Sequence, residues 1–319
     1  LVEQGQIERS DADATLDRIS THVDLAEAAA DADVVVEAVP EKMAIKRDVY
    51  EDLEAAAPDR TIFATNTSSL SITALADVTE RPEQFCGMHF FNPPVRMELV
   101  EVISGAETAE ETLDLISDLA VEMGKTPVRV RKDSPGFIVN RVLVPLMNEA
   151  AWIVESDDAT IEEVDSTTKY DLGLPMGSFE LADQVGVDVG YHVLEYMYQE
   201  LGDAYRPCPL LAQKVEKDEL GKKTGRGFYN YEDGGASTPT DAGREDIQER
   251  LLALMANEVA GLVAEDVADP AAIDEAVKLG AGFPDGPAKM ADDYGIAALV
   301  DRLDHLHEET DEARYDAED

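Results

Sequence analysis

The fold is decided by residues 34–64, which read VVVEAVPEKMAIKRDVYEDLEAAAPDRTIFA. Val34–Val39 is an apolar, β-branched run that predicts a buried strand, and Thr61–Ala64 predicts a second one. Between them, Lys42–Ala57 has the apolar spacing of an amphipathic helix. A strand, a helix and a second strand form a βα unit, which is typical of a parallel sheet covered by helices.

This alternation of strands and helices continues as far as residue 131. The second strand is followed by Asn66-Thr-Ser-Ser-Leu70, a turn rich in hydroxyl and amide groups. Ligands of open α/β sheets bind beyond the carboxyl ends of the strands, so this turn is a candidate binding segment. The alternative is that it caps a helix starting near Ser71. Further strands are predicted over residues 85–91, 97–103 and 127–131, and a helix over residues 109–123.

The chain after Asp133 has long helical patterns and repeats itself. When it is shifted by 109 residues, identical residues coincide without any gap. Coincidence on this scale indicates two copies of one helical module. The coinciding residues include Asn148-Glu149 with Asn257-Glu258, Asp165 with Asp274, Gly173 with Gly282, Pro175 with Pro284, Gly177 with Gly286 and Gly186 with Gly295.

These patterns divide the chain into three parts. We predict a helix-covered sheet domain over residues 1–132, a first helical module over residues 133–232 and a second helical module over residues 244–319. Segment 233–243 is rich in Gly, Ser, Thr and Pro, which indicates a linker. The expected fold class is therefore α/β, followed by two repeated all-α modules.

Composition excludes several classes of protein. Lys and Arg number 26 and Asp and Glu number 69, which gives a formal net charge of −43, although 44% of residues are hydrophobic. Such a field repels phosphate and anionic lipid, so we expect no nucleic-acid partner. No apolar run is long enough for membrane insertion. We favour a halophilic surface, on which salt screens the repulsion, and a dedicated cationic partner is the alternative.

The cysteine and histidine spacings do not predict a metal site. Cys86 and Cys208 are the only cysteines and lie far apart, so we expect neither a disulfide framework nor structural zinc. His305 and His307 are two residues apart on a predicted helix and therefore point to different faces. A cytoplasmic location fits this cysteine usage best.

His89 and Glu101 form the clearest candidate for chemistry. They flank a Pro-Pro turn, and a hairpin centred on Pro94 and Val95 would place them opposite each other. Directly opposed residues have Cβ atoms about 4.5–5.5 Å apart, so the carboxylate can hold one imidazole nitrogen. That arrangement suits a general base, because the imidazolium is stabilised in place. The alternative is a core histidine beside an incidental glutamate.

Two further segments are less specific. Asn140 lies in a helix that begins near Pro135 and has an apolar face, so it either has a polar partner or faces solvent. Residues 221–228 read GKKTGRGF, a basic, Gly-rich loop in a very acidic protein. Such a loop is a candidate phosphate contact, although its spacing alone is weak evidence.

Taken together, these segments resemble the L-3-hydroxyacyl-CoA dehydrogenase family. Each motif is modest alone, but the ordered set is specific and covers the whole chain, because some family members have a duplicated C-terminal helical domain. The motifs are Val36-Glu-Ala-Val-Pro-Glu41, Thr65-Asn-Thr-Ser-Ser69, His89-Phe-Phe-Asn-Pro93, Leu99-Val-Glu-Val-Ile103, Asp133-Ser-Pro-Gly-Phe-Ile-Val-Asn-Arg141 and Gly221-Lys-Lys-Thr-Gly225.

The resemblance implies an NAD-dependent oxidation of L-3-hydroxyacyl-CoA to 3-oxoacyl-CoA, in fatty-acid β-oxidation or related acyl-CoA metabolism. By it, His89 is the base that takes the 3-hydroxyl proton and Glu101 orients it. Ser68 and Asn140 bind the substrate oxygen. The implied cofactor-binding residues are Ala38, Glu41, Lys46, Asn66, Ser68, Asn92 and Lys223.

The first residues depart from the family pattern. Family members begin with a strand, a G-x-G-x-x-G turn and a helix, none of which this sequence contains. We therefore expect an incomplete Rossmann-like doubly wound sheet, a truncated chain and poor binding of NAD by the chain as given.

The resemblance leaves other functions open. One alternative is a non-catalytic relative that keeps the helical part as an acyl-CoA or partner-binding module, and a weaker one is a related enzyme that acts on a sugar acid. In family members with one helical module, two subunits pair through it. A second module in the same chain can cover that surface, so we expect an internal pseudo-dimer and favour a monomer.

Overall fold

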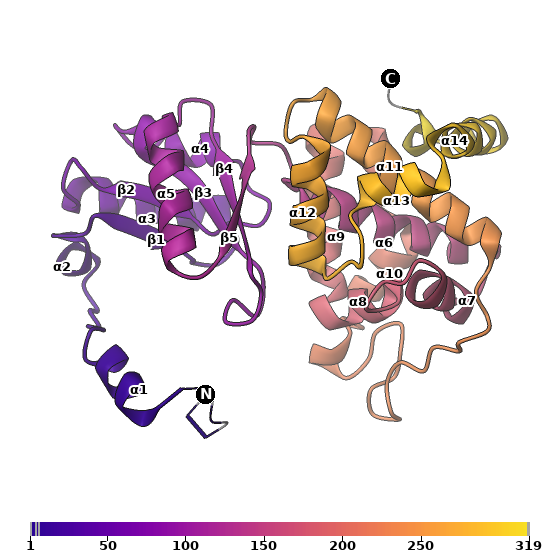
Figure 1. Ribbon diagram of the computed structural model, residues 1–319, viewed down its shortest axis with the longest axis horizontal. Coiled ribbons are helices and arrows are strands. Elements are labelled where there is room, and N and C mark those ends of the chain that lie inside the picture. Colours follow the sequence, from indigo (N-terminus) through magenta and orange to yellow (C-terminus); the bar gives the residue numbers. More distant parts are fainter. Residues whose placement is uncertain (1, 4, 6, 318–319) are drawn as a thin grey trace.

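The computed structural model describes residues 2–3, 5 and 7–317, and it has two lobes (Figure 1). One lobe holds all the strands of the described chain, and the other holds the helices that follow residue 138. The strands are β1 (Val34–Glu37), β2 (Ile62–Thr65), β3 (Phe85–Phe90), β4 (Leu99–Ser104) and β5 (Thr126–Val130). The helices of this lobe are α1 (Arg9–Leu16), α2 (Leu25–Ala29), α3 (Met43–Ala56), α4 (Ile72–Ala76) and α5 (Glu110–Glu122).

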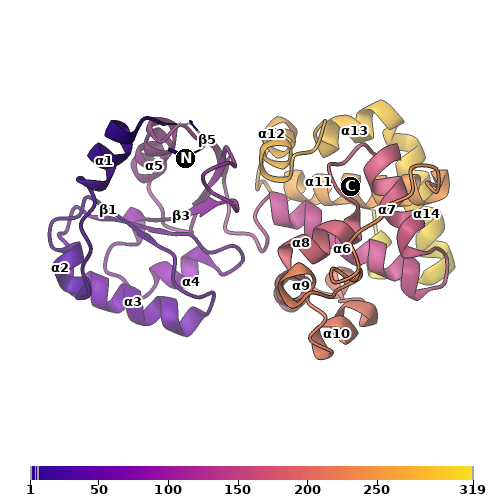
Figure 2. The same cartoon turned by 90° about the horizontal axis from the view of Figure 1, so that it is seen from below.

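The five strands form one sheet in the order β1-β2-β3-β4-β5. All neighbours are parallel except β3 and β4, which are antiparallel. The difference follows from the connections, because helices link the parallel neighbours of the first half whereas a short Pro-Pro loop joins β3 to β4. Helices α3 and α4 cover one face and α5 covers the other (Figure 2). The predicted doubly wound α/β sheet is thus confirmed.

Alternating side chains fill the cores on the two faces. Phe63 and Phe85 point to the face with α3 and α4, whereas Ile62, Cys86 and Met88 point to the face with α5. Burial raises the pKa of the Cys86 thiol to about 12, which makes it a core residue rather than a nucleophile.

The first strand is shorter than its apolar run predicts. Val34–Val39 is predicted as a strand, but β1 ends at Glu37 because its carboxylate accepts a hydrogen bond from the Val39 N–H at 2.6 Å and turns the chain. β1 is also an edge strand, and Val36 on it is 44% exposed. Helix α1 buries none of its residues.

The second lobe consists of two similar sets of helices. The first module contains α6 (Val139–Glu155), α7 (Ile161–Ser166), α8 (Ser178–Val185), α9 (Val187–Leu201) and α10 (Pro209–Glu216), and a π-helical turn over Thr167–Asp171 follows α7. The second module contains α11 (Glu245–Ala264), α12 (Pro270–Ala281), α13 (Pro287–Tyr294) and α14 (Ile296–Thr310). Short 3-10 turns lie at Pro82–Gln84, Asp203–Tyr205, Lys222–Thr224 and Ala313–Tyr315.

The two modules repeat in detail. The carboxylate of Asp165 accepts hydrogen bonds from two backbone N–H groups at the start of α8 at 2.8 and 3.1 Å. Asp274 does the same at the start of α13 at 2.7 and 3.1 Å. In each copy the preceding glycine leaves room for this carboxylate, because a Cβ at Gly177 or Gly286 would overlap it. The predicted repeat is therefore confirmed.

The two modules also pack against each other through α6 and α11, and the contacts are reciprocal. The Arg141 guanidinium lies 3.0 Å from Glu258, and the Arg250 guanidinium lies 2.5 Å from Glu149. Arg141 and Arg250, like Glu149 and Glu258, are related by the 109-residue shift. These buried ion pairs join the copies about a pseudo-two-fold axis.

The sheet lobe contacts the second module as well as the first. Helix α12 packs on β4 and β5, and Gly280 on it lies so close to Leu99 that a Cβ would approach that side chain to 2.7 Å. Arg131 pairs with Asp266 and Asp269 at 3.2 and 2.6 Å. Within the described ranges, no helix is long and apolar enough to cross a membrane.

Candidate active site

The candidate site lies where the carboxyl ends of β1, β2 and β3 meet. These strands are parallel neighbours, so the residues that follow them gather at one edge of the sheet. Helix α6 begins beside the same edge, because its first residues bond to Glu101 on β4. The site is therefore built from both lobes.

His89 and Glu101 are paired across the β3–β4 ladder, as the spacing predicts. Nδ1 of His89 lies 2.7 Å from Oε2 of Glu101, and both side chains are buried. When Nδ1 carries the ring proton, it donates a hydrogen bond to the Glu101 carboxylate. Nε2 is then the acceptor nitrogen, and among the described residues it has no hydrogen-bond partner.

Glu101 has a second set of partners that spacing did not predict. Its Oε1 accepts hydrogen bonds from the backbone N–H groups of Ile138 and Val139 at 3.1 and 3.0 Å. These groups lie at the start of α6, where unpaired donors and the helix dipole favour a negative charge. One fully buried carboxylate thus fixes the imidazole and anchors the first helix of the other lobe.

The turn after β2 is organised around Glu41. The Oε1 atom of Glu41 accepts hydrogen bonds from the Thr67 hydroxyl and from the N–H groups of Ser68 and Ser69 at 2.9 and 3.2 Å. Burial raises the pKa of Glu41, but the Thr67 bond and the charge of Lys46 outweigh it and hold that pKa below its ordinary value. The carboxylate is therefore ionised and keeps the turn in one shape.

Ser68 and Asn140 come together from the two lobes. Nδ2 of Asn140 donates to the backbone carbonyl of Ser68 at 3.2 Å, and both residues are half-buried. Of the two alternatives predicted for Asn140, a polar partner or contact with solvent, the structure shows a polar partner. The two residues predicted to bind the substrate oxygen are neighbours in the structure, and their roles stay predictions.

Lys46 lies inside the domain rather than at the site surface. Its amine donates hydrogen bonds to Glu37 at 2.8 Å and to the Val39 carbonyl at 3.3 Å, and it lies 3.4 Å from Glu41. The Lys46 side chain is only 1% exposed. In this arrangement Lys46 positions the turn between β1 and α3. Direct contact with a cofactor by Lys46 stays a prediction.

The other predicted cofactor residues are more accessible, and one of them lies in another lobe. Ala38 and Asn92 are exposed beyond β1 and β3. The Oδ1 atom of Asn66 accepts from the Phe90 N–H at 2.8 Å, and its Nδ2 has no hydrogen-bond partner within the described chain. Lys223 is paired with Asp188 in the first helical module, beside the junction of α8 and α9.

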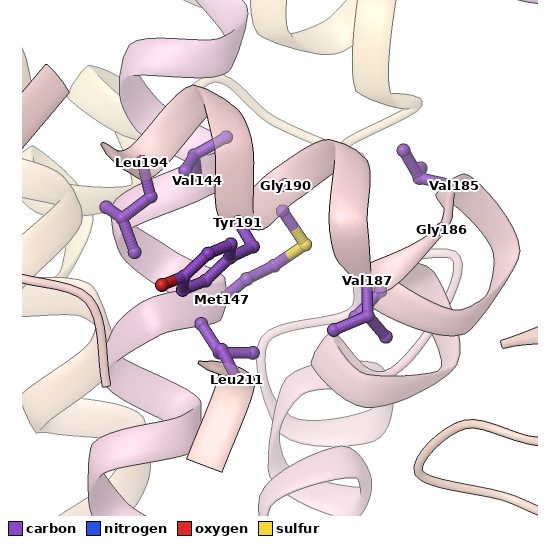
Figure 3. Close-up of a pocket in the computed structure, with 10 residues that line it drawn as sticks. Val144, Met147, Val185, Gly186, Val187, Gly190, Tyr191, Leu194 and Leu211 are labelled. Carbon is purple, nitrogen blue, oxygen red and sulfur yellow. The ribbon is translucent and has the colours of Figure 1, made fainter. Parts of the chain in front are cut away.

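A small apolar pocket begins one turn beyond Asn140 on α6. Figure 3 shows Val144 and Met147 of α6 pointing toward side chains of α9 and Leu211 of α10. Its volume is about 10 Å³, which is about the space that one water needs. This pocket does not hold an acyl chain in the present conformation.

Comparisons with known proteins agree with this geometry. The family model described as 3-hydroxyacyl-CoA dehydrogenase, NAD binding domain, matches residues 1–134. The model described as 3-hydroxyacyl-CoA dehydrogenase, C-terminal domain, matches residues 136–231 and again residues 247–319. The chain belongs to the 3-hydroxyacyl-CoA dehydrogenase family. The predicted family and its cofactor, NAD, are thereby confirmed.

Individual members of the 3-hydroxyacyl-CoA dehydrogenase family are similar over most of the chain. The mitochondrial hydroxyacyl-coenzyme A dehydrogenase of Sus scrofa is 43% identical over 219 residues, which are 68% of this chain and 69% of that protein. The 3-hydroxybutyryl-CoA dehydrogenase of Clostridioides difficile is 46% identical over 202 residues, 63% of this chain and 72% of that protein. The crystal structure of 3-hydroxybutyryl-CoA dehydrogenase from Escherichia coli K12 has a TM-score of 0.90 and 27% identity, and the match covers 98% of this chain and 85% of that one.

The structure adds residues that sequence reasoning did not select. In this member of the 3-hydroxyacyl-CoA dehydrogenase family, the Phe91 and Phe137 rings flank His89 at centroid distances of 4.5 and 5.9 Å. Phe137 has φ of 52°, a left-handed conformation that aromatic residues rarely adopt. Asp133 accepts from the Ser71 hydroxyl and the Thr73 N–H at 2.7 and 2.8 Å, tying α4 to the segment that leads into α6. The Pro-Gly-Phe sequence before α6 was the one sequence feature that could have indicated an unusual backbone at Phe137.

Proposed function

We propose that this protein oxidises the 3-hydroxyl group of an L-3-hydroxyacyl-CoA to a ketone, in fatty-acid oxidation or related acyl-CoA metabolism. The observation that carries the proposal is the buried pair of His89 and Glu101, which leaves Nε2 of the imidazole without a partner at the ligand edge of the sheet. Family membership supplies the substrate class.

Different residues of this chain accept the proton of the hydroxyl group and bind its oxygen. Nε2 of His89 accepts the proton as the O–H bond breaks, and Glu101 stabilises the imidazolium that forms. Ser68 and Asn140 donate hydrogen bonds to the substrate oxygen and hold it in place while its charge changes. Bound NAD would supply the acceptor for the hydride that leaves C3.

Residues at the strand ends fit the nicotinamide and ribose part of this cofactor. Asn66 offers an amide N–H pair that no described residue uses, and Ala38 is exposed just beyond the neighbouring strand β1. Asn92 extends the same edge beyond β3. These groups supply donors and acceptors for a carboxamide and for hydroxyl groups.

The decisive experiment replaces the proposed base. His89→Gln is expected to lower kcat for 3-hydroxybutyryl-CoA oxidation by several orders of magnitude with little change in NAD affinity, and Glu101→Gln is expected to have a smaller effect in the same direction. His192→Gln, an exposed histidine on α9, is the matched control and should keep wild-type activity. Full activity of His89→Gln would refute the assignment. Acyl-CoA binding without turnover in the unmodified protein would favour the non-catalytic alternative.

We also propose that the protein works in a cytoplasm of high salt concentration. The formal charge of −43 supports this, because salt screens the self-repulsion by which such a surface destabilises a compact fold. Cys86 and Cys208 are free and buried, which suits a reducing compartment. The midpoint of thermal unfolding is expected to rise steadily between about 0.1 and 2 M KCl, and calorimetry at constant pH measures it. A midpoint that falls over this range would contradict the proposal.

We propose further that the chain is a monomer. The face of α6 is covered within the chain by α11, through the reciprocal ion pairs of Arg141 and Arg250. Light scattering coupled to gel filtration should give the mass of one chain, 34.7 kDa. A mass of twice that value would show that another surface pairs.

A further inference from the structure

A second cavity lies far along the chain from the proposed active site and shares no residue with it. Its volume is about 200 Å³, and it is formed between α11 and α14 of the second module, with the end of α6 as a third side. Within the described part of the chain, three arginines line it, namely Arg244, Arg250 and Arg302. Three guanidinium groups around one cavity are unusual in a protein with 26 basic and 69 acidic residues.

Two of these arginines are already paired. Arg244 donates to both carboxylate oxygens of Asp246 at 3.1 and 2.7 Å. Arg250 donates to Glu149 at 2.5 Å, to Tyr315 at 2.8 Å and to Asp158 at 3.3 Å. Carboxylates of the protein already balance the charges of Arg244 and Arg250. These two arginines therefore form part of the cavity wall and do not need a ligand as a partner.

Arg302 is different, because it has no hydrogen-bond acceptor among the described residues. Its Nε is buried without a partner. The nearest carboxylate oxygen, on Glu249, lies 3.9 Å away, which is beyond hydrogen-bond distance. A buried donor without an acceptor costs about 1–3 kcal/mol, and buried polar groups in proteins are nearly always satisfied. Nε itself is closed to solvent, but the side chain as a whole keeps 22% exposure, so an acceptor can reach other parts of the guanidinium from solvent.

The carboxylates that line the cavity are paired with groups other than Arg302. Asp158 and Asp246 bind Arg250 and Arg244 as described above. Glu309 lies 3.3 Å from Nε2 of His305, on the same helix. None of these carboxylates contacts Arg302, whose only ion-pair partner within the described chain is Glu249 at 3.9 Å, so its guanidinium keeps hydrogen-bond donors without an acceptor.

The internal repeat shows that the fold does not require this charge. Counting back 109 residues, Arg302 corresponds to Val193 and Leu306 to Met197, both on α9. Val193 and Met197 are buried and apolar. The same helical position is thus filled by packing in the first module and carries a guanidinium beside a cavity in the second.

We propose that this cavity binds a small oxyanion, a phosphate or carboxylate group, whose oxygens accept hydrogen bonds from the guanidinium of Arg302. The planar fork of arginine matches two oxygens of either group. A volume of about 200 Å³ accommodates such a group together with part of a small molecule that carries it. The proposal does not depend on the dehydrogenase activity.

Titration calorimetry on the full chain tests this site. Inorganic phosphate and acetate are titrated separately at constant ionic strength, with KCl as the balancing salt. Saturable binding of phosphate assigns a phosphate-bearing ligand, and saturable binding of acetate alone assigns a carboxylate-bearing one. Saturation by neither anion overturns the proposal, because the cavity then takes only water.

Variants locate the binding. Arg302→Gln should weaken the anion affinity at least tenfold at one site per chain, whereas Arg60→Gln, which removes an exposed arginine of the sheet lobe, should leave it unchanged. Wild-type affinity in Arg302→Gln overturns the proposal. Should that variant fail to fold, Glu309→Gln decides, since removing this exposed wall carboxylate should tighten binding about twofold and unchanged or weaker binding refutes the site.

Discussion

The first and second helical modules have the same fold but different chemistry. Both keep the carboxylate that holds the start of α8 or α13, at Asp165 and Asp274. Both keep a glycine with φ near 110° before the following helix, at Gly186 and Gly295. At the position of Asn140, however, the second module has Glu249. The residues that both copies keep are those that the helical fold needs.

This difference offers a way to separate structural from functional residues within one chain. The two copies share a fold but only one begins beside His89, so selection on chemistry acts on one copy alone. A residue present in both copies therefore predicts an effect on stability. A residue present in one copy predicts an effect on binding or catalysis, and three sets of substitutions test this rule.

The largest effect is expected at the shared arginines. Arg141→Met leaves the buried Glu258 carboxylate without its cation and should lower the free energy of unfolding by about 3–5 kcal/mol. Arg250→Met removes one of the two cations of the buried Glu149, which keeps Arg314 at 2.9 Å, so its loss should be smaller but in the same direction. Urea denaturation at constant salt measures this. Adding Glu258→Gln to Arg141→Met removes the uncompensated charge and should recover part of the loss. If one arginine matters and its counterpart does not, the copies are not structurally equivalent.

Asn140 should show the opposite behaviour. Asn140→Ala is expected to lower kcat about 100-fold, as for the loss of one donor to a substrate oxygen, with a small change in stability. Glu249→Gln, at the matching position of the second module, should keep kcat within about twofold. Steady-state kinetics on both variants measure the contrast. Equal losses of kcat would mean that the second module takes part in catalysis.

The smallest effect concerns pH. Burial raises the pKa of Asp165 to about 6, although hydrogen bonds from Phe179, Tyr229 and Glu180 oppose it. Because the folded state binds this proton more tightly than the unfolded chain, the contribution of Asp165 to stability is complete below about pH 4 and is lost as pH rises through about 6.

The difference in unfolding free energy between the wild type and Asp165→Asn should therefore fall by roughly 2 kcal/mol from pH 4 to pH 6. Denaturation at several pH values measures it, and a constant difference would contradict the raised pKa. Asp274→Asn replaces one of the two acceptor oxygens by an NH2 group, so at pH 7 it gives the cost of losing one of these backbone hydrogen bonds in the other copy.

The sequence predicted features that depend on short-range order. The helix predicted over Lys42–Ala57 is observed over Met43–Ala56. The opposition of His89 and Glu101 followed from the length of one turn, because register in a hairpin is set by its loop. The coincidence of Asp165 with Asp274 in the repeat predicted equivalent positions, and the structure shows both carboxylates bound to the start of a helix.

Features that join distant segments were not predicted. The bond from Glu101 to the start of α6 depends on how two lobes dock, and no local pattern encodes that. The burial of Lys46 was not predicted, because a lysine at a predicted ligand edge was expected to face the ligand. In the structure its amine instead donates a hydrogen bond to Glu37 inside the domain. The pairs of Arg141 and Arg250 could have been found, since both arginines and their glutamates obey the 109-residue shift.

The reciprocal contact between the two modules also has a consequence for assembly. Pro175 lies 3.6 Å from a Cβ built on Gly282, and Pro284 lies 3.6 Å from one built on Gly173, so each half completes the other. Since both halves belong to one polypeptide, their docking is a unimolecular equilibrium with a fixed effective concentration. Dilution that would dissociate two separate subunits leaves this interface intact, and its occupancy is independent of how much protein the cell makes.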